Sequence, residues 1–209
     1  MITAETIKSD WKKQQEAKRI PATTLNIFIG YDSKEPAAYH VLAHSLIRRA
    51  TLPVTITPLS LQSVQRIYTR ERTPLESTEF SMTRFLVPYL SNYRGHSVFM
   101  DSDMLCLSDP MELMMDMVSY PNKAVFCCQH DYVPKTEKKF LGQLQTSYPR
   151  KNWSSMMIFN NELCKNLTPD YVNSATGLQL HRFQWIEDNL IQPLPLTWNW
   201  LVGEYEPNP

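Results

Sequence analysis

The stretch that decides the fold is Ser97-Val98-Phe99-Met100-Asp101-Ser102-Asp103-Met104, residues 97–104. Its first half has the composition of a buried strand, and two carboxylates follow directly. Residues i and i+2 of an extended chain face the same way, so Asp101 and Asp103 can reach one ion. Two anions held together are unfavourable unless a cation neutralises them, and oxygen ligands suit Mg²⁺, Mn²⁺ or Ca²⁺. The stretch therefore predicts a divalent-cation site, of the kind that can hold a diphosphate, at the end of a strand.

Other interpretations of the Asp-x-Asp pair stay open. Aspartates in turns often accept hydrogen bonds from local backbone amides, which would make the pair purely structural. A haloacid-dehalogenase-type phosphatase also places Asp-x-Asp after a strand, and Asp101 would then be a nucleophile. That pattern continues with Gly and Thr, whereas this chain continues with Met104 and Leu105. A calcium loop of the EF-hand kind would need a Gly at position 106, where this chain has Cys106.

Composition narrows the class of protein. The 209 residues are enough for one sizeable domain, and the formal net charge of zero argues against a basic surface that binds nucleic acid. No apolar run approaches membrane-spanning length, and residues 1–20 lack the apolar core of a secretory signal. We therefore expect a cytoplasmic protein with no integral membrane segment, and we leave peripheral membrane association open.

The cysteines and glycines exclude two kinds of site. None of the four cysteines, Cys106, Cys127, Cys128 and Cys164, forms a CxxC pair, so we expect buried thiols and no zinc site. Cys127 and Cys128 are neighbours in an expected strand and should face opposite sides of it. The chain has no glycine-rich phosphate loop. Any bound phosphate would therefore be held by a metal and by basic side chains.

Strands alternate with helices along the chain, which predicts an α/β domain with a mostly parallel sheet. The expected strands cover residues 25–29, 53–59, 97–100, 124–128 and 155–160, with an extended edge segment at 194–200. The expected helices cover residues 36–49, 80–90 and 110–117. Residues 1–22 are polar and suit an arm or an exposed helix before the domain.

Polar residues follow three of these expected strands: Tyr31-Asp32, Asp101 to Asp103, and His130-Asp131. Ligands of parallel α/β sheets bind beyond the carboxyl ends of the strands. The topology therefore predicts that these three groups share one crevice.

Residues 80–113 carry a resemblance to a known family. They contain Phe80-Ser81-Met82-Thr83-Arg84-Phe85-Leu86, then Val98-Phe99-Met100-Asp101-Ser102-Asp103, then Leu107-Ser108-Asp109-Pro110. This order resembles the core of GT-A fold glycosyltransferases, particularly glycosyltransferase family 8, which includes glycogenin and bacterial lipopolysaccharide galactosyl- and glucosyltransferases. The resemblance extends from about residue 25 to residue 200 and is strongest over 80–113. It implies that residues 23–209 form a GT-A-like nucleotide-sugar-binding domain, which a C-terminal truncation could have shortened.

The resemblance implies a donor site. Asp101 and Asp103 would hold Mn²⁺ or Mg²⁺ against the diphosphate of a nucleotide-sugar, and Arg84 would contact the nucleotide or the donor sugar. The other implied donor contacts are Gly30, Tyr31 and Asp32 at the base, Met100 and Ser102 beside the nucleotide, and Trp153, Ser154 and Ser155 at the sugar. The last three replace the family's usual Asn-Ala-Gly, which leaves the identity of the sugar open. A solvated helix arginine at 84, a half-buried aromatic at 31 and a core tryptophan at 153 are the structural alternatives.

The resemblance also implies candidates for catalysis. Glu187 or Asp188 would lie near the anomeric carbon, where a carboxylate can stabilise an oxocarbenium ion or act as a nucleophile. His130 or Asp131 would face the acceptor and accept its hydroxyl proton. Helix-end charges at 187 and 188 and a surface histidine at 130 are the alternatives. The family's third metal ligand, a C-terminal His, has no counterpart after His181, so either the chain is a fragment or water fills that position.

The sequence thus predicts a metal-dependent, retaining glycosyltransferase. It would move a sugar from a nucleotide-sugar, with a UDP-sugar expected, to an unidentified glycan, lipid-linked sugar or small molecule. A non-catalytic nucleotide-sugar-binding protein or an inactive fragment is the first alternative. A metal-dependent phosphatase is the second.

Overall fold

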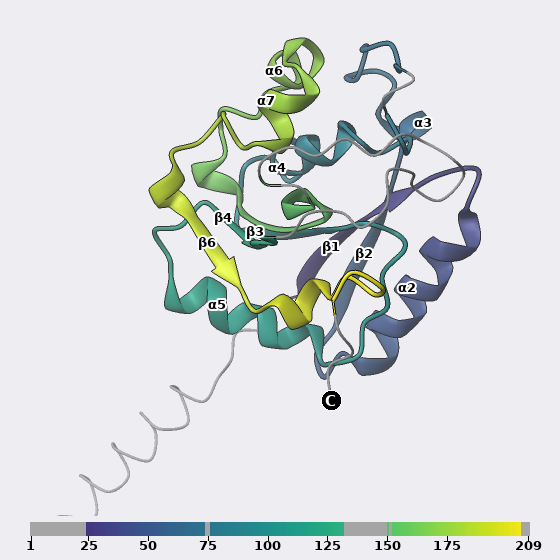
Figure 1. The fold of residues 1–209 in the computed structure, drawn as a ribbon, viewed down its shortest axis with the longest axis vertical. Coiled ribbons are helices and arrows are strands. Elements are labelled where there is room, and N and C mark those ends of the chain that lie inside the picture. Colours follow the sequence, from purple (N-terminus) through teal and green to yellow (C-terminus); the bar gives the residue numbers. More distant parts are fainter. Residues whose placement is uncertain (1–23, 74–75, 132–149, 151, 206–209) are drawn as a thin grey trace, which may run out of the picture.

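A six-stranded mixed sheet forms the centre of the protein, in the strand order β2-β1-β3-β5-β4-β6 (Figure 1). This computed structural model describes residues 24–73, 76–131, 150 and 152–205. The strands are β1 Leu25–Tyr31, β2 Val54–Ser60, β3 His96–Met100, β4 Val125–Cys128, β5 Met156–Asn160 and β6 Ile191–Leu194. Five of them run parallel, and β5 runs antiparallel to both of its neighbours. The predicted α/β class with a mostly parallel sheet is confirmed.

The direction of β5 matters for the site. Because β5 is reversed, its amino end lies at the same edge of the sheet as the carboxyl ends of β1, β3 and β4. The short helix η4, Trp153–Ser155, directly precedes β5. The backbone N–H of Asp101 donates to the carbonyl of Ser155 (2.8 Å), which joins the end of β3 to η4.

Helices cover both faces of the sheet (Figure 1). The α-helices are α2 Pro36–Arg49, α3 Leu61–Val64, α4 Val87–Leu90, α5 Leu113–Ser119, α6 Pro169–Ser174 and α7 Gly177–His181. The other 3₁₀ helices are η1 Thr83–Leu86, η2 Pro110–Glu112, η5 Asn161–Leu163, η6 Asp188–Leu190 and η7 Leu196–Asn199. No helix in the described ranges has the length and apolar character needed to cross a membrane.

Each face of the sheet has its own apolar core. On one face, Leu42 of α2 and Leu113 of α5 pack against strand residues such as Ile29. On the other face, Phe85, Phe99 and Phe183 belong to a core that η1, α6 and α7 cover.

The prediction of buried thiols, with Cys127 and Cys128 on opposite faces of their strand, is confirmed. All four thiols are free and buried, and Cys127 and Cys128 belong to opposite cores. Burial raises the pKa of Cys128 to about 12, so this thiol stays protonated at neutral pH.

Two predicted elements differ in the structure. The continuous helix expected over residues 80–90 is a turn followed by η1 and α4, because Pro88 has no N–H to donate and sits in the first turn of α4. The extended segment expected over 194–200 is wrong. The edge strand β6 covers residues 191–194 and the chain then turns into η7. The arm expected at residues 1–22 lies outside the described residues.

Candidate functional site

Asp101 and Asp103 lie in a turn at the carboxyl end of β3. The Asp101 side chain is mostly buried, and its Oδ1 lies 2.9 Å from Nη1 of Arg84. Asp103 is exposed to solvent. One carboxylate of the pair is therefore fixed by the protein, and the other faces outward.

Arg84 is a buried arginine, with 6% of its surface exposed. Its Nη1 also donates to the carbonyl of Ser154 (2.8 Å), and its Nε donates to the carbonyl of Phe80 (3.3 Å). The guanidinium carbon lies 4.9 Å from the ring centroid of Phe99 and 5.5 Å from that of Phe80. The interpretation of Arg84 as a solvated helix residue is therefore wrong.

The carboxylates at this turn suit a hard divalent cation whose remaining ligands are water and substrate oxygens. The described residues contain no group of three or more His, Cys, Asp and Glu side chains that could hold a metal. Mg²⁺ and Mn²⁺ do not need such a group, because they commonly bind through one or two carboxylates together with water and phosphate oxygens. Asp101 and Asp103 are the two carboxylates at this turn that would hold such an ion.

At the end of β1, Asp32 ties two loops together. Its Oδ1 accepts from the Lys34 N–H (3.0 Å) and its Oδ2 accepts from the Glu79 N–H (3.1 Å). Tyr31 is half-buried and lies edge-on to Tyr39, with ring centroids 5.6 Å apart. Both carboxylate oxygens of Asp32 therefore already accept backbone hydrogen bonds in the ligand-free protein.

Gly30 is fixed by packing. A Cβ at this position would lie 2.4 Å from the ring of Phe80, the same ring that lies beside Arg84. Any larger residue would displace the Phe80 ring. Gly30 therefore connects the end of β1 to the Arg84–Asp101 pair through one aromatic ring.

Met100 and Ser102 flank Asp101. Met100 is buried in the core under α2 and α5, so it can meet a ligand at this edge only through its backbone. Ser102 is also buried, with 4% exposed.

The residues of η4 are held by neighbours on several elements. Ser154 Oγ is hydrogen-bonded to Nδ1 of His181 (2.7 Å), and Ser155 Oγ accepts from Nδ2 of Asn199 (2.6 Å). Trp153 is half-buried, donates from Nε1 to the carbonyl of His130 (3.0 Å) and packs near Phe183. This packing agrees with the core interpretation of Trp153.

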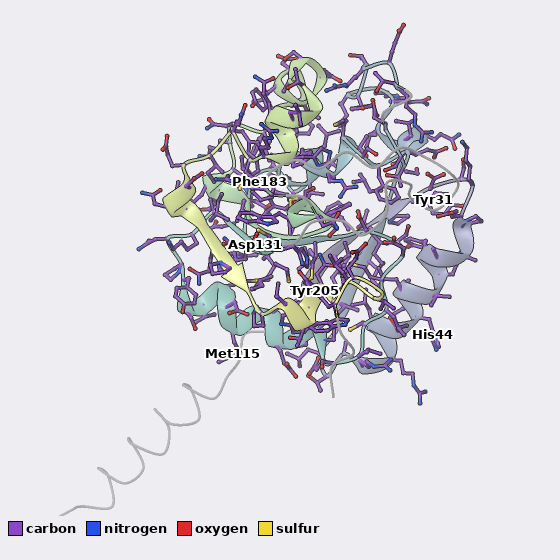
Figure 2. All side chains as sticks on the ribbon, in the orientation of Figure 1. Tyr31, His44, Met115, Asp131, Phe183 and Tyr205 are labelled. Carbon is purple, nitrogen blue, oxygen red and sulfur yellow. The ribbon has the colours of Figure 1, made fainter. Side chains whose placement is uncertain are left out.

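His130 is buried, with 5% exposed, so the surface alternative is wrong. Its Nε2 lies 3.0 Å from Nδ2 of Asn199, a donor, so Nε2 accepts; its Nδ1 lies 2.7 Å from the hydroxyl of Tyr205. Burial lowers the pKa of His130 to about 4, which keeps the ring neutral. The neighbouring Asp131 is exposed, and Figure 2 labels it near Tyr205 at the centre of the view. Asp131 also raises the pKa of the Tyr205 hydroxyl, after the larger effect of burial.

Glu187 and Asp188 are both exposed at the start of η6. Asp188 Oδ1 lies 2.6 Å from Nη2 of Arg150, whose guanidinium carbon is 5.3 Å from the ring centroid of Trp153. Asp188 is thus joined to η4 through Arg150.

The predicted residues therefore fall into connected groups. Arg84, Asp101 and Ser154 are in direct contact, and His130 contacts Trp153. Sequence reasoning missed Arg150, His181 and Tyr205, which bind these residues from distant parts of the chain. Asn199 was also not among the predicted site residues, although it binds both His130 and Ser155.

Comparisons with known proteins extend these observations. No protein-family model matches the chain. Protein CDI of Arabidopsis thaliana is 46% identical over 201 residues, which cover 94% of this chain and 76% of that protein.

Solved structures share the fold. WbbM, a bifunctional glycosyltransferase solved in its apo form, matches 85% of this chain with a TM-score of 0.58 and 16% identity. The glycosyltransferase GlyE of Streptococcus pneumoniae TIGR4 matches 87% of this chain with a TM-score of 0.53 and 13% identity. This chain spans 40% of the WbbM chain and 47% of the GlyE chain, and identity this low establishes the fold alone. The chain therefore belongs to the same family as Protein CDI of Arabidopsis thaliana, and its fold is that of the GT-A glycosyltransferases.

Proposed function

We propose that this protein is a metal-dependent glycosyltransferase that moves a sugar from a nucleotide-sugar, a UDP-sugar, to an acceptor hydroxyl. One observation carries the proposal. A buried Arg84 is paired with Asp101 beside the exposed Asp103, at the carboxyl edge of a GT-A sheet. This edge is where ligands of parallel α/β sheets bind.

In this proposal Asp101 and Asp103 hold Mn²⁺ or Mg²⁺. When bound, the cation supplies Lewis-acid neutralisation of the diphosphate leaving group. Arg84 adds a fixed positive charge at the same edge, and it is pre-oriented by the Ser154 and Phe80 carbonyls. Asp103 is the ligand free to turn towards the cation, because Asp101 is already held by Arg84.

The remaining donor contacts are those that the resemblance to glycosyltransferase family 8 implies. We assign the base to Gly30, Tyr31 and Asp32, with Met100 and Ser102 beside the nucleotide. We assign the donor sugar to η4, where Trp153, Ser154 and Ser155 lie next to the Arg84–Asp101 pair. Because the hydroxyls of both serines are already hydrogen-bonded, sugar hydroxyls would share these bonds or replace them.

The candidates for catalysis are Glu187 and Asp188 near the anomeric carbon and His130 and Asp131 towards the acceptor. Asp131 is exposed beyond β4, and Glu187 and Asp188 are exposed at η6. The low pKa of His130 makes it a weak base at neutral pH, so we propose that it positions Trp153 and Tyr205 and leaves the proton transfer to other groups. A retaining transfer in which the leaving phosphate takes the acceptor proton needs no protein base.

A thermal-shift screen with UDP- and GDP-sugars, each with and without Mn²⁺, tests the donor site. We expect a UDP-sugar to raise the melting temperature only when Mn²⁺ is present, because bound ligand stabilises the folded state by mass action. If no nucleotide stabilises the protein with metal, the proposal fails. Metal-dependent binding without hydrolysis or transfer of any sugar would favour the non-catalytic binding protein.

A further inference from the structure

A pocket of about 240 Å³ lies beside the segment of residues 182–188 and Arg150. It is lined by Arg150, Arg182, Phe183, Gln184, Ile186 and Asp188. Two arginines and one aspartate line it, so the lining carries a net positive charge.

Arg182 has a hydrogen-bonding capacity that the described residues do not use. Its Nε is buried and has no acceptor among them. A buried donor without a partner is unfavourable, and few occur in native proteins. Because this Nε is itself buried, an oxygen of a bound anion would reach it only after the Arg182 side chain shifts towards the pocket.

Arg150 is held rigidly at the same pocket. Its Nη2 contacts Asp188 (2.6 Å), its Nη1 donates to the carbonyl of Arg182 (2.9 Å), and its guanidinium lies over Trp153. Its orientation is therefore fixed before any ligand arrives, which lowers the entropic cost of binding.

The backbone around the pocket is strained. Arg150, Asn152 and Phe183 have φ values of 62°, 62° and 57°, in the left-handed region that residues with side chains rarely adopt. Such residues cluster at functional sites, where the surrounding structure holds them in place. Phe183 and Arg150 both line the pocket, and Asn152 precedes η4. Figure 2 labels Phe183 below α6 and α7.

The pocket adjoins the proposed donor site. Trp153 contacts Arg150 on the pocket side, and the carbonyl of the next residue, Ser154, accepts from Arg84. The pocket residue Arg150 and the Arg84–Asp101 pair therefore contact neighbouring residues of the same short helix.

We propose that this pocket binds an anionic group, a carboxylate or a phosphate, of the acceptor. Arg182 is the main ligand and Arg150 supports it. A guanidinium presents parallel N–H donors that match the oxygens of either anion. The inference rests on the proposed transferase function, because it assigns the pocket to the acceptor of that reaction.

The test measures binding to the full chain in saturating UDP and Mn²⁺, so that the donor site is filled. The probes are glucuronate, glucose 6-phosphate and uncharged glucose, titrated by NMR chemical shift. We expect at least one of the two anionic sugars to bind about tenfold or more tightly than glucose. Whichever of glucuronate and glucose 6-phosphate binds more tightly shows whether the pocket prefers a carboxylate or a phosphate. Equal affinities for the three sugars would overturn the proposal.

Variants locate the binding. Arg182→Gln should abolish the preference for the anion. Arg182→Lys should retain part of it, because lysine keeps the positive charge but lacks the parallel N–H donors of the guanidinium. The control Arg66→Gln, at an exposed arginine, should leave the preference unchanged. If Arg182→Gln leaves the preference for the anion unchanged, the assignment to this pocket is overturned.

The same samples separate this inference from the transferase proposal. If UDP binds with Mn²⁺ but no anionic sugar is preferred, only the pocket assignment fails. If UDP does not bind but the Arg182-dependent preference remains, the transferase proposal fails and the anion site stands.

Discussion

Arg84 places a full positive charge inside the protein, where few arginines are found. Contacts with Asp101, two backbone carbonyls and two aromatic rings stabilise this charge. The sequence predicted that Arg84 and Asp101 belong to one site. It did not predict their direct contact, because a pair 17 positions apart meets only through the packing of η1 against β3.

A double-mutant cycle tests this pair. Arg84→Met should destabilise the fold by about 2–3 kcal/mol, because it removes the ion pair of a mostly buried carboxylate. Adding Asp101→Asn should recover part of the loss, giving a coupling of about 1 kcal/mol or more in urea unfolding. Strictly additive effects would show that the pair does not act as a unit.

Gly30 gives a second prediction at the scale of one residue. Gly30→Ala should cost about 1–3 kcal/mol, because the new Cβ overlaps the packed ring of Phe80. Gly177→Ala is the matched control. Its Cβ would meet only the flexible end of Met82, and it lies at a helix position that favours alanine. Equal melting temperatures for the two variants would contradict this account of Gly30.

At the scale of elements, apolar periodicity and turn residues located the first five strands and the helix that begins at Pro36. They failed where tertiary contacts decide the local structure. Residues 196–199 form η7, in which Asn199 binds His130 and Ser155. These two partners lie 69 and 44 residues away in the sequence. Pairings this distant leave no local pattern, and the same holds for Arg150 with Asp188 at the pocket.

His130 connects β4, η4, η7 and the turn that ends at Tyr205, so its protonation should loosen these elements together. The pKa of His130 is lowered from 6.5 to about 4 in the folded protein. A group with a lowered folded pKa contributes full stability above its unfolded pKa and loses it as pH falls. We therefore expect a stability plateau above pH about 6.5 and a loss of up to roughly 3 kcal/mol towards pH about 4.

Urea unfolding across pH 4–7 measures this loss. His130→Gln should flatten the decline, whereas His44→Gln, at an exposed histidine of α2, should leave it as in the original protein. A decline that is unchanged by His130→Gln would exclude this histidine as its cause.

At the scale of the whole molecule, one reversed strand organises the site. The antiparallel β5 places η4 against the Asp101 turn, and η4 also contacts Arg150 of the proposed anion pocket. The sequence predicted the α/β class and the edge of the sheet that carries the polar residues. It did not predict the direction of β5, since an apolar strand of five residues looks the same in either orientation.

The central claim is that Asp101 and Asp103 hold a cation against a nucleotide diphosphate. Calorimetric titration of UDP, with Mn²⁺ and with EDTA, tests it most directly in the original protein, in Asp103→Ala and in the control Asp170→Ala. Asp103 and Asp170 are both exposed, so neither change should disturb the fold. We predict that UDP binds tightly only with Mn²⁺, and that Asp103→Ala alone weakens this binding by about tenfold or more. UDP binding that is equal with and without Mn²⁺, or a metal dependence that survives in Asp103→Ala, would contradict the account.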